Sequence, residues 1–325
     1  MTARVSVVIP NWNGLRHLAE CFQALDAQEF RDFEVIFVDD ASSDGSIAWV
    51  EANASCARIV ARNENGGFAK AVNDGIRASS AQYIALLNND THAAPGWLGA
   101  LVAGLDEHPK YDFAASLMML YWEDGRVNAA GDVYDPFQMV GKNRGLRRSA
   151  EKYTHLERVF GACAGAAAYR RSFFDDVGLF DEDFFLNAED TDLNVRALLA
   201  GKRCLYVPEA VVRHKLRSTV AELPAWQTDR TTIRNESIVV FKDYPSSLLP
   251  FAILMWPYRL LRGVFPLNPR AWSKIPRNLA NLGDRFRAEG EGRRMGLAKR
   301  SGVQALRTVP TVTVLRWMLR GRGSA

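Results

Sequence analysis

Short apolar runs that alternate with amphipathic stretches constrain the fold of this chain more than any other feature of its sequence. Over the first 120 residues, five runs are apolar almost throughout, and the stretches between them have apolar residues at helical spacing. Between the first two runs, for example, Leu18, Phe22 and Leu25 fall on one helix face. Strands that are apolar on both faces and separated by helices imply a largely parallel sheet that helices cover on both sides.

The limits of these elements follow from the apolar pattern and from the turn residues that flank it. The predicted strands are Val5–Ile9, Glu34–Val38, Arg58–Ala61, Tyr83–Leu87 and Phe113–Leu117, and the predicted helices are Leu15–Ala27, Ser46–Asn53, Ala69–Ala78 and Trp97–Glu107. Further on, a helix is predicted over Glu189–Leu199, and two short strands over Cys204–Val207 and Val211–Arg213. In sheets of this kind, ligands bind beyond the carboxyl ends of the strands.

Polar clusters follow three of the predicted strands at that edge. They are Pro10–Gly14, Asp39–Gly45 and Asn88–Asp90. One such cluster can be an ordinary turn with a helix cap. Three of them at one edge of a sheet predict a shared ligand site.

Residues 122–158 are polar and rich in glycine, and they show little periodicity. A connection of this length within a compact domain is often a binding loop or lid. A β-strand excursion with a solvated basic turn at Arg144, Arg147 and Arg148 explains the same composition. Both interpretations stay open at this point.

The N-terminus and the cysteines bear on the compartment. Residues Met1–Pro10 lack the basic start, long apolar middle and cleavage site of a signal peptide. The apolar runs all fall short of the about 18 residues that a membrane-spanning helix requires. The four cysteines stand far apart without a metal-binding spacing, so they are predicted to be free thiols in a reducing compartment. We therefore expect a cytoplasmic chain that can touch a membrane but does not span it.

Charge is divided unevenly along the chain. Residues 251–325 contain 15 basic and 3 acidic side chains, whereas residues 1–250 contain 26 basic and 34 acidic ones. Trp256, Tyr258, Arg259 and Arg262 form a mixture that is typical of a membrane interface. We expect residues 223–325 to form a basic helical region that contacts the membrane peripherally. The alternative is packing on the rest of the chain or in an oligomer; nucleic acid is not an expected partner, because no helix-turn-helix, RRM or zinc pattern is present.

Six segments carry a family resemblance when they are taken in order. They read VSVVIPNWNG, VIFVDDASSDGS, NENGGFAKAVNDGI, YIALLNNDT, GACAGAAAYRRSFFDDVGLFDEDFF and AEDTDLNVRALLAGKRCLYVPEAVVRH. From about Val5 to His214 the chain resembles the inverting glycosyltransferases of family 2, and in particular their rhamnosyltransferase-like branch. The resemblance implies a GT-A domain over residues 1–222, a Rossmann-like mixed α/β sheet that binds a nucleotide-sugar and has helices on both faces.

The resemblance also implies which side chains bind the nucleotide-sugar donor. A carboxylate after the second strand would accept a hydrogen bond from the base, a role given to Asp40 in preference to Asp39, which can instead cap the following turn. Gly67 and Lys70 would meet the diphosphate at a helix N-terminus, although a lysine on a helix surface is often only solvated. The full donor set is Pro10, Asn11, Asp39, Asp40, Gly67, Lys70, Asn88 and Asn89.

A divalent metal ion, Mg²⁺ or Mn²⁺, is implied at Asp90 and His214. Hard cations prefer oxygen ligands, and one held here would neutralise the leaving diphosphate. Asn88 stands where the family places the first acid of its metal motif, so weaker metal binding is expected. His214 has an ordinary alternative, as a histidine that is only hydrogen-bonded within the fold.

Glu189 and Asp190 resemble the acidic pair of the family's ED motif. Inversion needs a base that takes the proton of the acceptor, and the resemblance gives this role to Asp190 with Glu189 in support. Asp192 can assist, or it can be a first-turn helix acid without a catalytic part. A charged helix start with no catalytic role is the alternative for the whole run.

The expected reaction moves rhamnose from dTDP-rhamnose, or another sugar from a dTDP- or UDP-sugar, to a hydroxyl of a polyprenyl-diphosphate-linked or other glycan. Such a reaction belongs to bacterial cell-envelope polysaccharide synthesis at the inner face of the membrane. The competing hypothesis is a GT-A scaffold that has lost activity, for which Asn88 is the sole support in the sequence. A dinucleotide-dependent dehydrogenase is disfavoured, because no GxGxxG motif follows the first strand.

Overall fold

The computed structural model describes residues 2–215, 225–265, 272–273 and 275–320, together with most of their side chains. The strands are β1 Val5–Asn11, β2 Phe33–Asp39, β3 Arg58–Ala61, β4 Tyr83–Leu87, β5 Thr91–Ala93, β6 Phe113–Leu120, β7 Val127–Ala130, β8 Asp132–Asp135, β9 Val140–Asn143, β10 Glu157–Val159, β11 Ala166–Arg170 and β12 Cys204–His214. The helices are α1 Leu15–Asp26, α2 Ser46–Asn53, α3 Phe68–Ala78, α4 Trp97–Glu107, α5 Arg171–Val177, α6 Glu189–Leu199, α7 Ala225–Asp243, α8 Leu249–Val264, α9 Ile275–Ala280, α10 Leu282–Ala305 and α11 Thr311–Arg320.

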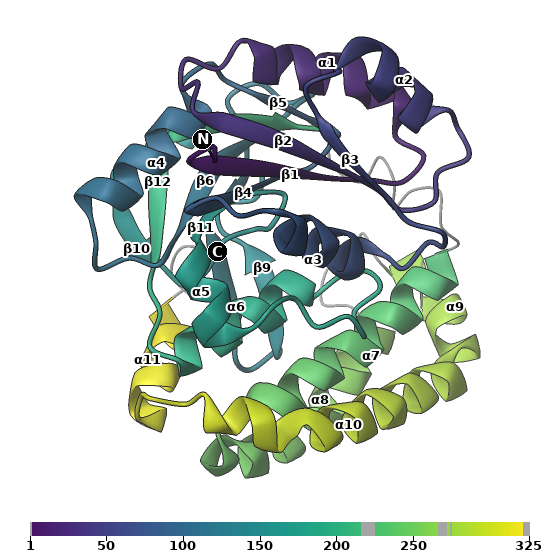
Figure 1. Ribbon diagram of the computed structural model, residues 1–325. Coiled ribbons are helices and arrows are strands. Elements are labelled where there is room, and N and C mark those ends of the chain that lie inside the picture. The colour runs from purple at the N-terminus through teal and green to yellow at the C-terminus, as the bar shows by residue number, and fades with distance from the viewer. Residues whose placement is uncertain (1, 216–224, 266–271, 274, 321–325) are drawn as a thin grey trace.

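Within the described residues, a ten-stranded mixed sheet runs through the centre of the molecule (Figure 1). Its main path has the order β10-β12-β6-β11-β4-β1-β2-β3, with β5 added beside β12 and β7 beside β6. Strands β3, β2, β1 and β4 are parallel, so their carboxyl ends meet at one edge. Strand β11 is antiparallel to both β4 and β6 and makes the sheet mixed.

The two faces of the sheet have separate apolar cores. On one face α1 and α4 contribute Leu18 and Leu101, and on the other face α3, α5 and α6 contribute Val72, Phe173 and Leu193. The predicted helical cover on both faces is therefore confirmed. The alternation of apolar strands and amphipathic helices was a sufficient signal for α1 and α3, which bury the apolar face that their sequence presents, whereas α6 is buried on all sides.

Two details of the predicted strands differ from the structure. The segments predicted as two short strands after α6 form one strand, β12, whose register shifts between Val207 and Val211. Pro208 lies at this irregularity, where a residue without a backbone N–H does not interrupt a regular ladder. Of the two interpretations of residues 122–158, the structure shows the β-strand excursion: β7 joins the main sheet and β8 pairs with β9.

The basic turn of that excursion is not uniformly solvated. Arg144 is buried, its guanidinium lies 4.9 Å from the ring centre of Tyr153 and 5.7 Å from that of Tyr206, and it pairs with Glu157 at 2.6 Å. Arg147 remains exposed. The expectation of a solvated turn is therefore wrong for Arg144, since the nearby Tyr153 and the distant Tyr206 cover it.

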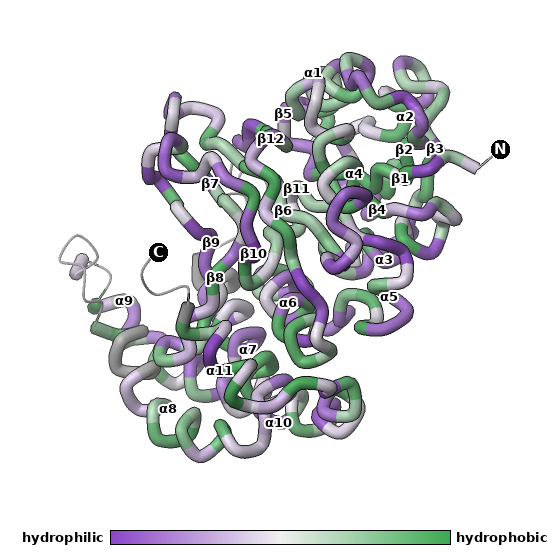
Figure 2. The backbone as a smooth tube through the Cα atoms, turned by 90° about the vertical axis from the view of Figure 1, so that its left-hand side faces the viewer, coloured by the Kyte–Doolittle hydropathy of each residue, from purple (hydrophilic) through white to green (hydrophobic). Residues whose placement is uncertain are grey.

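The C-terminal helices build a third core against α6. Val195 of α6 is buried with Ile238 of α7 and Met318 of α11. Helix α10 lies close along α7, because a Cβ at Gly292 would stand only 2.2 Å from the Arg234 carbonyl oxygen. Figure 2 shows these helices gathered at one end of the sheet. The domain boundary predicted at residue 222 falls in residues 216–224, outside the described part, and it stays a prediction.

Candidate active site

Side-chain amides tie together the ends of three central strands. Asn11, at the end of β1, donates from Nδ2 to Asp39 Oδ1 at 2.9 Å, and Asn89, after β4, donates from Nδ2 to Asn11 Oδ1 at 2.6 Å. The other Asp39 oxygen accepts the backbone N–H of Ser42 at 2.8 Å. This bond caps the turn that follows β2, which is the alternative role left open for Asp39, and the Asp39 side chain is fully buried. Pro10 lies on β1 directly before this junction.

Asp40 holds the glycine-rich segment before α3. Its two carboxylate oxygens accept the backbone N–H groups of Gly66 and Gly67 at 2.9 and 2.8 Å, and Arg62 Nε lies 2.9 Å from Oδ1. Burial raises the pKa of Asp40, and the two amide bonds and Arg62 oppose that rise. In the structure Asp40 therefore shapes the entry to α3, and its contact with a nucleotide base stays a prediction.

Gly67 occurs where no other residue fits. Its φ is +83°, and a Cβ there would lie 2.3 Å from the carbonyl oxygen of Phe185. That same carbonyl accepts the backbone N–H of Phe68 at 3.3 Å. The N-terminus of α3, where the diphosphate is expected, is thus fixed against the loop that precedes α6. Lys70 lies half-buried in the first turn of α3, beside Gly66.

The structure brings together the two residues predicted to bind a metal ion. His214 Nε2 lies 3.2 Å from Asp90 Oδ1, because β12 pairs with β5 so that His214 stands opposite Thr91. His214 Nδ1 lies 2.8 Å from the amide oxygen of Asn128, and this contact holds the ring with Nε2 facing Asp90. All three side chains are buried.

This donor set fits a divalent ion that has further ligands from outside the protein. A carboxylate oxygen and an imidazole nitrogen suit Mn²⁺ and tolerate Mg²⁺. The described residues contain no cluster of three or more histidine, cysteine, aspartate or glutamate side chains that could enclose a metal ion by themselves. Phosphate oxygens and water would have to complete the shell. Asn88 lies in the same turn, and its carbonyl oxygen accepts the Thr91 hydroxyl at 2.6 Å.

Glu189 and Asp190 begin α6 and lie at its positive N-terminal end. Asp190 Oδ1 accepts the backbone N–H of Thr191 at 2.6 Å. Burial raises the pKa of Asp190, against the opposing effect of its bonds to Thr191. Burial and the neighbouring charge of Asp190 raise the pKa of Glu189 to about 8. The pKa of both carboxyls is thus raised, so the pair resists carrying two negative charges at once.

Sequence reasoning missed two buried side chains of this site. Asp132, the first residue of β8, accepts a hydrogen bond from Asn194 at 3.2 Å, and burial together with the charge of Asp190 raises its pKa well above the usual range. Asn128, which orients His214, lies on β7. Both belong to the excursion at residues 122–158, whose sequence has no periodic signal that would single out either residue.

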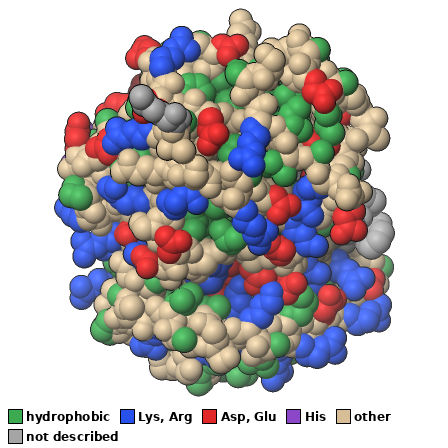
Figure 3. Space-filling view, viewed as in Figure 1, with side chains coloured by type: hydrophobic (Ala, Val, Ile, Leu, Met, Phe, Trp, Pro, Cys, Tyr) green, Lys and Arg blue, Asp and Glu red, His purple; other side chains and the backbone are tan. Residues whose placement is uncertain are grey.

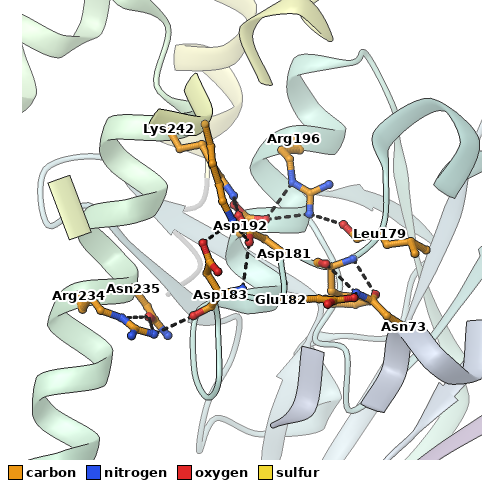
Figure 4. Close-up of polar contacts among 12 residues, drawn as sticks. Asn73, Leu179, Asp181, Glu182, Asp183, Asp192, Arg196, Arg234, Asn235 and Lys242 are labelled. Atoms are coloured by element: carbon orange, nitrogen blue, oxygen red, sulfur yellow. Dashed lines mark hydrogen bonds and ion pairs between the residues drawn. The ribbon is translucent and has the colours of Figure 1, made fainter. Parts of the chain in front are cut away.

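Asp192 has a different role from its neighbours. It is fully buried, and its Oδ2 lies 2.9 Å from Arg196 Nε and 2.8 Å from the terminal nitrogen of Arg196. Its other oxygen pairs with Lys242 of α7. Figure 4 shows Asp192 between these two cations, in a network that also includes Asp181. Of the two roles left open for Asp192, the contacts favour a structural one.

The raised pKa of Glu189 makes stability depend on pH. Between its ordinary value of 4.5 and about 8, the folded protein holds this proton more tightly than the unfolded chain does, so the contribution is complete below about pH 4.5 and is lost as pH rises through about 8. Glu189→Gln removes the titration. We expect the stability of the parent relative to this variant to fall steadily from pH 5 to pH 8, measured by urea unfolding. A difference that stays constant over that range would contradict the raised pKa.

Comparison with known proteins identifies the family. The model of the family described as Glycosyl transferase family 2 matches residues 6–178. The N-acetylglucosaminyl-diphospho-decaprenol L-rhamnosyltransferase of Mycobacterium tuberculosis is 29% identical over 245 residues, which cover 67% of this chain and 78% of that protein. The uncharacterized glycosyltransferase EpsJ of Bacillus subtilis is 27% identical over 231 residues, which cover 69% of this chain.

The curated relatives differ in length from this chain. It spans 64% of the Bacillus protein and 20% of an uncharacterized protein from Sinorhizobium fredii that matches it at 28% identity. Among solved structures, GalNAc-T7 with UDP, GalNAc and Mn²⁺ superposes with a TM-score of 0.62 at 18% identity, covering 87% of this chain and 55% of that one. S. aureus TarS 1–349 with UDP-GlcNAc gives 0.56 at 16% identity, covering 94% and 91%. The chain belongs to glycosyl transferase family 2, and its fold is the GT-A fold of these transferases.

Proposed function

We propose that the protein is an inverting glycosyltransferase that uses Asp190 as its base. One observation carries the proposal: residues 164–165 lie next to both Asp190, the expected base, and the turn that carries Asp90. The backbone N–H of Ala164 lowers the pKa of the Asp190 carboxyl, so the two groups are neighbours, and the carbonyl of Gly165 accepts the backbone N–H of Asn88 at 2.9 Å. The base and the turn that carries Asp90 therefore lie on either side of one short segment, as a donor and an acceptor meeting there require.

In the proposed reaction, Asp190 accepts the proton of the acceptor hydroxyl as that oxygen bonds to the anomeric carbon. The bond from that carbon to the nucleoside diphosphate breaks on the opposite face, which inverts the configuration. Glu189 in its protonated form adds no second charge beside the base. The N-terminus of α3, with Gly67 and Lys70, favours the anionic diphosphate. When bound at Asp90 and His214, a divalent ion neutralises charge on that leaving group.

The finer identity of the substrates rests on the relatives. The name of the Mycobacterium tuberculosis protein supports rhamnose as the sugar and a polyprenyl-diphosphate-linked glycan as the acceptor. A dTDP- or UDP-sugar donor, at the inner face of the cell membrane during cell-envelope polysaccharide synthesis, agrees with that name and with the UDP-GlcNAc bound by TarS. A catalytically inactive scaffold is the second candidate, and Asn88 in place of an acid favours it.

Incubation with a panel of dTDP-, UDP- and GDP-sugars, a membrane lipid extract and Mg²⁺ or Mn²⁺ separates the two candidates. We expect nucleoside diphosphate to be released with one donor in preference to the rest, and the release to stop with EDTA. No release from any donor, with or without lipid, would rule out the enzyme and leave the scaffold.

Asn128 provides a test of the metal site that does not depend on turnover. Asn128→Ala removes the acceptor that fixes the His214 ring, and losing such a partner lowers metal affinity by about 10- to 100-fold. We expect this loss in a Mn²⁺ titration followed by calorimetry in the presence of a nucleoside diphosphate. Asn53→Ala, at an exposed position of α2, serves as the matched control. Equal Mn²⁺ affinity in both variants would place the ion elsewhere.

The structure divides the apolar residues of the basic tail into two groups. Trp256 Nε1 donates to the buried Glu289 at 2.9 Å, and Trp317 is buried with Arg158 3.9 Å from its ring centre, so both pack inward. On α8, by contrast, Ile253 and Leu254 are 57% and 76% exposed. The side chains of Arg259 and Arg262 lie outside the described part. Part of the tail thus follows the packing alternative, and we propose the exposed part of α8 for peripheral membrane contact.

Figure 3 shows basic side chains around the lower edge of the molecule, where the C-terminal helices lie. None of the helices in the described ranges combines the length and hydropathy of a bilayer-spanning segment. Peripheral attachment through α8 would therefore combine this positive charge with shallow insertion of apolar side chains.

Serine in place of both Ile253 and Leu254 tests the membrane proposal. Each apolar side chain that inserts contributes about 1.5–3 kcal/mol, so we expect co-sedimentation with anionic vesicles to weaken by at least about tenfold. The control replaces by serine Leu146 and Leu156, which are exposed in the excursion at residues 122–158. If both double variants sediment as the parent does, α8 is not the contact.

A further inference from the structure

Helix α7 contacts the loop that leads into the catalytic helix, and these contacts are specific. Residues 181–188 lie between α5 and α6, and they end directly before Glu189 and Asp190. Asn187 and Ala188 both have left-handed backbone angles, with φ of 67° and 66°. Residues with a Cβ rarely adopt this conformation without support from their surroundings. Helix α6 also begins without a side-chain cap, so its start needs that support from elsewhere.

Asn235 of α7 supplies the support. It is fully buried, and its Nδ2 donates to two consecutive backbone carbonyls, those of Leu186 and Asn187, at 2.8 Å each. Its Oδ1 accepts from the guanidinium of Arg234 at 3.0 and 3.1 Å. All of the hydrogen-bonding capacity of this amide is therefore directed at the loop and at the side chain next to it.

Two neighbours of Asn235 hold the loop at further points. Arg234 donates to the carbonyl of Asp183 at 2.8 Å, as Figure 4 shows, and Thr232 Oγ1 accepts from the Asn187 amide at 3.1 Å. The opposite side of the loop touches the donor-side helix, because Phe185 contacts Gly67 and Phe68. The loop is thus enclosed between α7 and the expected diphosphate site.

We infer that α7 is a positioning element for catalysis, in which Asn235 holds the left-handed backbone that aims Asp190. The catalytic meaning of this inference rests on the proposed function. Asn235 touches neither the donor nor the acceptor, and it acts through the backbone of residues 186–187. Its loss should therefore lower the rate of the chemical step more than donor binding, since the residues expected to bind the nucleotide lie on or next to β1, β2, β4 and α3 rather than in the loop itself.

Hydrogen exchange tests the inference without any assay of activity. In the full-length protein, Asn235→Ala should speed deuterium uptake by at least about tenfold in peptides that cover residues 183–192. The matched control is Gln304→Ala on α10, which also removes an amide that donates to backbone carbonyls, here those of Lys242, Asp243 and Tyr244. Its uptake at residues 183–192 should match that of the parent. Equal uptake in the two variants overturns the inference.

Kinetics with an accepted donor then tests the catalytic part. We expect Asn235→Ala to lower kcat at least about tenfold with the donor KM within twofold, and Gln304→Ala to leave both unchanged. A parallel fall in both variants, or a loss confined to KM, overturns the positioning role. If the parent is inactive with every donor, the proposed function fails, whereas the exchange result still decides whether α7 holds the loop.

A milder pair of variants covers the case in which Asn235→Ala does not fold. Thr232→Val is nearly isosteric and removes only the oxygen that accepts from Asn187. The neighbouring Thr231→Val is its control. We expect a two- to fivefold faster uptake at residues 183–192 for Thr232→Val alone, and no difference between the two variants would count against the inference.

Discussion

Replacing Asp190 with asparagine is expected to lower kcat by about 10²- to 10⁴-fold while the affinity for the donor stays within about twofold. Asparagine keeps the size of the side chain and can still accept from the Thr191 N–H, but it cannot take up the proton of the acceptor. The measurement is single-turnover sugar transfer together with calorimetric binding of the donor. Asp175→Asn, at an exposed position of α5, is the control for the charge change.

Two other results of this experiment would give Asp190 a different role. If Asp190→Asn transfers sugar within about twofold of the parent, Asp190 is not the base. Glu189 and Asp132 are then the carboxyls to test, because desolvation and the charge of Asp190 raise the pKa of both. A loss of donor affinity equal to the loss of kcat would instead assign Asp190 to binding.

Replacing Lys242 with methionine is expected to lower the free energy of unfolding by about 3–5 kcal/mol, the usual cost of removing one partner from a buried ion pair. Lys242 is 1% exposed and lies 2.6 Å from Asp181, and it also pairs with the fully buried Asp192. After the substitution, Asp192 keeps its pair with Arg196 but has lost its second cation. Burial would raise the pKa of Asp181, but Lys242 and Lys299 outweigh that effect and hold it well below its usual range.

Urea unfolding at pH 7 measures this loss, and two further variants identify its cause. Lys242→Arg keeps the charge and should lose less stability. The double variant Lys242→Met with Asp181→Asn should recover part of the loss, since it removes one of the two carboxylates that face Lys242 while Asp192 keeps its pair with Arg196. A loss below about 1 kcal/mol for Lys242→Met would show that water or a neighbouring cation replaces the lysine.

Local signals were enough to predict most of the fold. The limits of α2, α4 and α6 were predicted to the residue: α2 and α4 each begin directly after a glycine, and α6 begins with the acids Glu189 and Asp190. The sequence also predicted that the polar clusters after β1, β2 and β4 lie at one edge of the sheet, since the carboxyl ends of parallel strands must meet. Features that depend on one segment and its flanking residues were therefore predictable from the sequence.

Roles that depend on two distant segments could not be predicted. Asn128 acquires its role only because β7 and β12 both border β6, which brings it to His214. Asn235 lies in a helix whose sequence gives no sign that loop carbonyls would face it. For the basic region of residues 223–325 the sequence left membrane contact and packing on the rest of the chain both open, and it could not show that Lys242, Lys299 and Arg300 bind aspartates and carbonyl groups inside the molecule.

The hydrogen bonds between α7 and residues 183–187 also bear on the order in which parts of the protein fold during synthesis. The sheet and the helices on its faces are complete once β12 has left the ribosome, but α7, which we propose to position Asp190, is made later, and α10, which packs along α7, is made later still. A nascent chain can therefore fold its donor site before its catalytic loop is fixed. Competence for transfer would then arise only after α10 has docked, so that the last helices made complete an active site built mostly from the first 214 residues.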